Sequence, residues 1–111
     1  MRWVFMLLVL SPTWAQAADA KRGELVAQVR CMPCHHLHRP SRSIGPSLYG
    51  VFGRVPTIKA VPFDIWDADA LEAWLSDPRL IKPNTRMRIP PIAARDRADL
   101  IAYFKEVGSE K

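Results

Sequence analysis

The stretch VRCMPCHHLH, residues 29–38, contains both cysteines and all three histidines of the 111-residue chain. Thiolates and imidazoles are the side chains that proteins most often use to bind metals or to form covalent links. Cys31 and Cys34 are separated by two residues, and His35 follows the second cysteine directly. Three kinds of site have this spacing: a thiol–disulfide redox pair, a zinc or iron–sulfur site, and a covalent haem attachment.

The first two kinds of site lack the surroundings that they require. A redox Cys-x-x-Cys pair usually begins a helix beside a βαβ pattern, and here the pair follows an expected helix with no strand pattern nearby. A closed metal site needs further ligands from a second part of the chain. No other cysteine exists, and the remaining histidines, His36 and His38, lie within four residues of Cys34. We therefore disfavour both.

The covalent haem attachment fits the motif directly. Two thiols at this spacing add to the two vinyl groups of one haem, and the histidine after the second thiol becomes an axial ligand of the iron. Cys31 and Cys34 are therefore predicted to hold one haem c, with His35 as the axial ligand.

The second axial ligand follows from elimination among four methionines. Met1 and Met6 belong to an expected export signal, and Met32 lies inside the attachment loop. The histidines next to His35 are too close to it in sequence to reach the opposite face of the haem. Met87 is therefore the predicted sixth ligand, and the alternative is an ordinary packed methionine.

The N-terminus has the pattern of a secretory signal. Arg2 gives a basic start, Trp3 to Leu10 form an apolar run, and Ala15 to Ala17 match a signal-peptidase site. About eight apolar residues are too few for a bilayer span of roughly 20. We expect a signal peptide at 1–17, a single domain at 18–111, export to the periplasm and no transmembrane segment in the mature chain.

The chain carries a net charge of +5, which favours partners with acidic surfaces. Nucleic acid is not an expected partner, because the basic residues are scattered and the chain is exported. Basic residues surround both ligand segments: Arg30, Arg39, Arg42, Lys82, Arg86 and Arg88.

Helical periodicity predicts an all-α fold. A helix is expected over Ala20 to Arg30, with an apolar side formed by Leu25, Val26 and Val29. A second is expected over Asp67 to Asp77, with Asp67 as N-cap and Pro78 as the stop; its apolar positions are Leu71, Trp74 and Leu75.

A third helix is expected from Asp96 or Arg97 to a stop at Gly108. Its apolar positions are Leu100, Ile101, Phe104 and Val107. The segment from His36 to Phe63 shows little periodicity and many prolines and glycines. A structureless segment of this length is unusual in a compact domain, unless it surrounds a large bound group.

From about Gly23 to Val107 the chain resembles the class I, mitochondrial-type, monohaem cytochromes c. The resemblance implies a small fold in which N- and C-terminal helices cross near Gly23 and loops wrap around one covalent haem. Four segments carry it: GPSLYGVFGR (45–54), DIWDADALEAWLSDP (64–78), IKPNTRM (81–87) and DRADLIAYF (96–104).

The resemblance also implies roles for individual residues. The carbonyl of Pro46 accepts a hydrogen bond from the ligand imidazole, and Arg54, Trp66 and Thr85 lie near the haem propionates. One departure is Trp74, which occupies the place of a tyrosine that bonds the methionine sulfur. The roles of this tryptophan and of the two histidines after the motif are left open.

The function that the resemblance implies is one-electron transfer by a bacterial periplasmic carrier, monomeric when free and not itself an enzyme. Its partners are expected to be redox proteins. One alternative is a dedicated cytochrome subunit of a periplasmic dehydrogenase or oxidase complex. Another is a ligand-binding or peroxidatic haem protein with an open sixth site, against which a usable Met87 argues.

Overall fold

The structure, a computed structural model, describes residues 1–4, 6, 8–10 and 17–109, and over these residues it is helical without any strand. The elements in chain order are α1 (Ala20–Arg30), α2 (Ala68–Ser76), α3 (Pro78–Ile81) and α4 (Ala94–Ser109). The predicted all-α class is therefore confirmed. Within the same residues, no helix combines the length and the apolar character needed to cross a membrane.

The predicted signal peptide falls partly on residues that the structure does not describe. Ala15 and Gln16 of the expected cleavage sequence are among them, so this processing site stays a prediction. The described residues before Asp19 form no helix, and Asp19 is the N-cap of α1.

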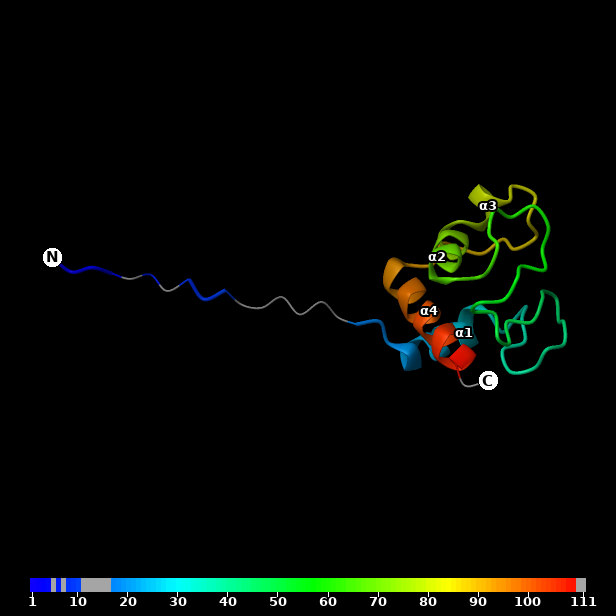
Figure 1. The fold of residues 1–111 in the computed structure, drawn as a ribbon, viewed down its shortest axis with the longest axis horizontal. Helices are drawn as coiled ribbons and strands as arrows, with labels where there is room; N and C mark the ends of the chain where they lie inside the picture. The colour runs from blue at the N-terminus through cyan, green and yellow to red at the C-terminus, as the bar shows by residue number, and fades with distance from the viewer. Residues whose placement is uncertain (5, 7, 11–16, 110–111) are drawn as a thin grey trace.

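Helices α1 and α4 cross each other, as Figure 1 shows, and a glycine makes the crossing possible. A Cβ on Gly23 would overlap the backbone carbonyl oxygen of Asp99 in α4. Ala27, one turn further along α1, is completely buried. The predicted crossing near Gly23 is confirmed.

The expected apolar side of α1 is wrong in two of its three residues. Leu25 is 60% exposed and Val29 is 72% exposed, whereas Gly23 and Ala27 are buried and Val26 is half-buried. The reason is the close approach of the two backbones, which leaves room only for small residues at the contact. Large apolar residues therefore had to lie on other faces of α1.

Helix α2 agrees with its prediction. The carboxylate of Asp67 accepts a hydrogen bond from the N–H of Ala70 (2.8 Å) and caps the helix, and Leu71, Trp74 and Leu75 are buried. Pro78 ends α2 as expected but also begins α3, because proline is well suited to the first turn of a helix.

Asp77 joins these two helices, since its carboxylate accepts hydrogen bonds from the N–H groups of Arg79 and Leu80. Helix α3 was not expected from the sequence.

Helix α4 is longer than expected. It begins at Ala94 rather than Asp96 and continues through Gly108, so the predicted stop at this glycine is wrong. A glycine costs little in a last turn, where few backbone bonds remain to be made. The predicted apolar side is confirmed, because Leu100 and Phe104 are buried.

The segment from His36 to Phe63 contains no helix or strand, as its composition predicted. A pair of backbone hydrogen bonds closes it against the start of α2: the N–H of Trp66 donates to the carbonyl of Arg54, and the N–H of Gly53 donates to the carbonyl of Trp66, both at 2.8 Å.

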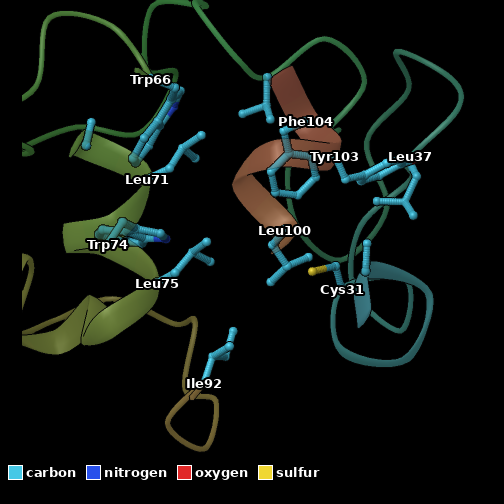
Figure 2. Packing of buried hydrophobic residues seen from close by; sticks show 13 residues of the cluster. Cys31, Leu37, Trp66, Leu71, Trp74, Leu75, Ile92, Leu100, Tyr103 and Phe104 are labelled. Carbon is cyan, nitrogen blue, oxygen red and sulfur yellow. The ribbon is translucent and has the colours of Figure 1, made fainter. Parts of the chain in front are cut away.

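The buried side chains come from two sides of the molecule. In Figure 2, those of Trp66, Leu71, Trp74 and Leu75 extend toward the part of the core that holds Cys31, Leu100 and Tyr103. The expected wrapping of these loops around a haem stays a prediction.

Candidate functional site

The cysteine motif forms a tight turn at the end of α1. The N–H of Cys31 donates to the carbonyl of Ala27 (2.8 Å), and the N–H of His35 donates to the carbonyl of Cys31 (2.9 Å). Cys31 is buried, with its sulfur in the interior (Figure 2), whereas Cys34 is exposed. The turn therefore places two free thiols next to one imidazole.

The chemistry of this turn opposes the two disfavoured kinds of site. Burial raises the pKa of the Cys31 thiol to about 11, whereas reactive redox cysteines have lowered pKa values. Over the described residues, no three cysteine, histidine or acidic side chains gather in a way that would hold a metal ion.

The imidazole of His35 is held in one orientation. Its Nδ1 lies 2.6 Å from the carbonyl oxygen of Pro46, and because a carbonyl only accepts, Nδ1 carries the proton. Nε2 then has the lone pair that a metal needs. A Cβ on Gly45 would overlap the imidazole ring, so glycine is required beside it. The sequence predicted the Pro46 contact, whereas the role of Gly45 was missed; a glycine before that proline was the only signal.

The segment around Met87 is also held in place. The thioether sulfur accepts a hydrogen bond from the indole Nε1–H of Trp74 (3.3 Å). The backbone N–H of Met87 donates to the hydroxyl of Thr85 (3.2 Å). At the far end of the segment, the guanidinium of Arg30 in α1 donates to the carbonyl of Pro90 (2.7 Å). The sequence did not predict this last link between α1 and the methionine segment.

Arg54 contributes a half-buried cation with spare hydrogen-bonding capacity. Its guanidinium donates to the carbonyls of Ser47 (2.6 Å) and Tyr49 (3.1 Å). Its Nε–H is buried and is the one buried side-chain nitrogen or oxygen among the described residues without a hydrogen-bond partner. Burial also lowers the pKa of Arg54. An unpaired N–H of this kind is costly unless a further acceptor, such as a carboxylate, is bound there.

Two more predicted residues contact either Met87 or the tryptophan that bonds its sulfur: Thr85 and Trp66. Trp66 is buried, and its ring packs edge-on against Trp74, with centroids 5.8 Å apart. Thr85 is buried, and its hydroxyl accepts from Met87, which leaves its own O–H free to donate elsewhere. Contacts of Arg54, Trp66 and Thr85 with propionates stay predictions.

The donors present fit a haem c. The chain offers two thiols, one imidazole with its second nitrogen fixed, one thioether with its sulfur oriented, and one half-buried cation with a buried, unsatisfied N–H. Each of these groups matches a different part of the cofactor: vinyl groups, two axial positions and a propionate.

The comparisons with known proteins agree with this fit. No protein-family model matches the chain. The cytochrome c of Euglena viridis is 34% identical over 97 residues, which are 78% of this chain and 95% of that protein. The cytochrome c of Guizotia abyssinica is 34% identical over 105 residues, covering 82% and 92%. Cytochrome c 2.1 of Caenorhabditis briggsae is 31% identical over 99 residues, covering 80% and 88%.

Proposed function

The chain belongs to the cytochrome c family, and from this membership we propose that it is a periplasmic one-electron carrier with His35 and Met87 as the axial ligands of its iron. The family brings one covalently bound haem c. When bound, this group supplies an iron that takes up and releases one electron. The protein then has to hold the haem, set its potential and keep both oxidation states in the same geometry.

The observation that carries the proposal is the rigid placement of both expected ligands. The Nδ1–H of His35 donates a hydrogen bond to the carbonyl oxygen of Pro46, and the sulfur of Met87 accepts one from the indole N–H of Trp74. Ligands that are fixed by the protein need not move when the charge of the iron changes. A soft thioether also favours ferrous iron and thereby raises the potential. This arrangement suits electron transfer better than the binding of an outside ligand.

The remaining residues anchor the cofactor. Cys31, which is buried, and Cys34, which is exposed, would form the two thioether bonds. Arg54, Trp66 and Thr85 would donate hydrogen bonds to the propionates. The unpaired Nε–H of Arg54 supports this assignment, because a buried carboxylate requires donors and a cation.

The cellular setting is part of the proposal. The basic start and the apolar run before Ala17 support removal of residues 1–17 and export, leaving 18–111 as the mature domain. Loss of Arg2 with residues 1–17 lowers the net charge from +5 to +4, and this remaining positive charge supports an acidic redox protein as the partner.

The test is the coordination state of the exported protein. We expect low-spin iron in both oxidation states, the weak red absorption band of ferric iron–methionine ligation, and little carbon monoxide binding at neutral pH. Met87→Ala should remove the band, lower the potential and admit carbon monoxide. If the unmutated protein is high-spin and binds carbon monoxide readily, it is a ligand-binding haem protein and the proposal is wrong.

A further inference from the structure

We propose that a groove at the start of α2 is a second docking surface, which receives lysine or arginine side chains of a basic redox protein. The inference rests on the proposed function and deepens it, because it adds a partner of the opposite charge to the acidic one already proposed. A carrier with two such surfaces can distinguish two partners by their charge.

The groove combines apolar and acidic side chains. Its volume is about 530 Å³, which is enough to hold a long side chain of another protein. Phe63 is half-buried and Ala70 is buried, so they form its floor, whereas Ile65 is 43% exposed. The aspartates that line it are all exposed and form its rim: Asp64, Asp67 and Asp69.

The charge around the groove is opposite to that of the chain as a whole. Five of the eleven acidic residues lie between Pro62 and Pro78, a stretch that contains no lysine or arginine. Asp64 and Asp69 take part in no ion pair within the part of the chain that the structure describes. Their negative charge is therefore not neutralised by the protein itself and is available to attract a basic partner.

The mixture of side chains favours a basic side chain over a metal ion as the occupant. Across the described residues, no three acidic, cysteine or histidine side chains converge closely enough to hold a metal. Lysine and arginine, in contrast, pack their aliphatic stems along apolar surface and keep the charged head in a polar environment. Phe63 and Ile65 offer the apolar surface, and the aspartates of the rim offer partners for the head.

The floor of the groove is connected to the proposed sixth ligand by direct contacts. The ring of Phe63 packs against that of Trp66, with centroids 5.4 Å apart, and Trp66 packs against Trp74, with centroids 5.8 Å apart. Figure 2 shows these two indoles one above the other beside α2. Trp74 in turn contacts the sulfur of Met87. Because electrons tunnel more readily through packed atoms than across a gap, a redox protein docked here is favourably placed.

The first experiment maps the binding of a basic protein to the haem-loaded, ferrous chain. The probe is a strongly basic mitochondrial-type cytochrome c, also ferrous, added at low salt while the backbone amide signals of this chain are followed by NMR. The signals of Asp64, Ile65 and Asp69 should shift, and those of Arg86 and Arg88 should not.

Variants test the charge and the apolar surface separately. The double variant Asp64→Asn, Asp69→Asn should bind the probe roughly threefold to tenfold more weakly, the effect of losing two exposed ion pairs. Ile65→Ser should weaken binding by a similar factor, because it removes exposed apolar surface. The control is the double variant Glu24→Gln, Glu106→Gln, which removes two negative charges from α1 and α4 and should leave the affinity unchanged.

Shifts confined to the segment around Met87, or a double aspartate variant with the affinity of the unmutated protein, overturn the inference. Absence of any binding of the probe at low salt does the same. If the chain instead associates with itself and the double aspartate variant does not, the occupant is a second copy and the proposed partner is wrong. Should that variant fail to fold, the map of shifts on the unmutated protein decides.

Failure of the proposed function is visible separately, because the ferric iron–methionine band would then be missing from the unmutated protein. A protein that has the band but does not bind the probe at the groove refutes the second docking surface alone.

Discussion

The backbone carbonyl oxygen of Asp99 occupies the place where a Cβ on Gly23 would lie. This contact joins residues 76 positions apart and sets how closely α1 approaches α4. Around it, the carboxylate of Asp99 accepts the backbone N–H of Asp19 (2.8 Å) and pairs with Arg22 (2.7 Å). Arg22 pairs with Asp96 as well. The crossing is therefore held by close backbone packing and by a small ionic network.

Gly23→Ala should destabilise the protein by about 3 kcal/mol, at the upper end of the cost of overpacking, because a rigid backbone rather than a flexible side chain must yield. Denaturant unfolding of the haem-loaded protein measures the change. Gln28→Ala, on the exposed side of the same helix, should stay within about 0.5 kcal/mol of the unmutated protein. Equal stability of the Gly23 variant would show that the helices separate without cost.

The ionic network predicts a pH dependence of stability. The N–H of Asp19, and next the guanidinium of Arg22, hold the pKa of Asp99 below its usual value. A carboxyl whose folded pKa is lowered stabilises the fold above its unfolded pKa, about 3.9 for Asp, and loses that contribution as the pH falls through the folded value. Unfolding measured from about pH 7 downward should show this loss. Asp99→Asn should be less stable at neutral pH and should lack this part of the pH dependence.

Both cysteines should be bonded to haem. The intact mass of the purified protein should equal its polypeptide, without residues 1–17 if the proposed signal is removed, plus one haem, and denatured protein should keep a haem-dependent signal on a gel. Cys31→Ala or Cys34→Ala should reduce the yield of folded protein strongly, because the haem supplies part of the core. Extraction of the haem by acid acetone, or titration of two free thiols, would refute the attachment.

Arg54→Gln should lower the potential and the stability together. Under the proposed function Arg54 would lie beside a propionate, and removal of this cation would leave uncompensated negative charge near the iron, which favours the ferric state. Loss of the bonds to the Ser47 and Tyr49 carbonyls should cost about 2 kcal/mol. Voltammetry and denaturant unfolding measure the two effects. The control is Arg79→Gln, which removes the same charge from an exposed position at the start of α3. It should change neither the potential nor the stability.

Electron exchange with an acidic partner should slow as salt rises. Arg86 and Arg88 are exposed on either side of Met87, and exposed charges are screened beyond about 8 Å at physiological ionic strength. With a small acidic blue-copper protein as probe, the rate constant should fall by roughly tenfold or more between low and high salt. The double variant Arg86→Gln, Arg88→Gln should weaken the dependence of this rate constant on salt. Lys105→Gln, in α4, should leave the salt dependence unchanged. A rate independent of salt would assign these charges to solubility alone.

Local signals in the sequence determined much of this protein. The Cys31–His35 motif indicated a haem site because the spacing of these side chains is itself the chemical requirement. The extent of α2 and its buried residues followed from an N-cap, a 3.6-residue period and a proline, all of which act within a few positions. The irregular segment from His36 to Phe63 was equally visible in its prolines and glycines.

Contacts between distant segments decided the rest. Leu25 and Val29 satisfy a helical apolar pattern, yet they are exposed because the approach of α4 admits only Gly23 and Ala27 at the crossing. The sequence did not show whether Trp74 could donate to the sulfur of Met87, because a bulkier indole stands where the family has a phenol. Only the packing of Trp74 on α2 shows that its N–H reaches this sulfur. Periodicity and capping report which face of a helix is apolar. They do not report how closely two backbones approach or which polar atoms meet, because those depend on the packed arrangement of the whole chain.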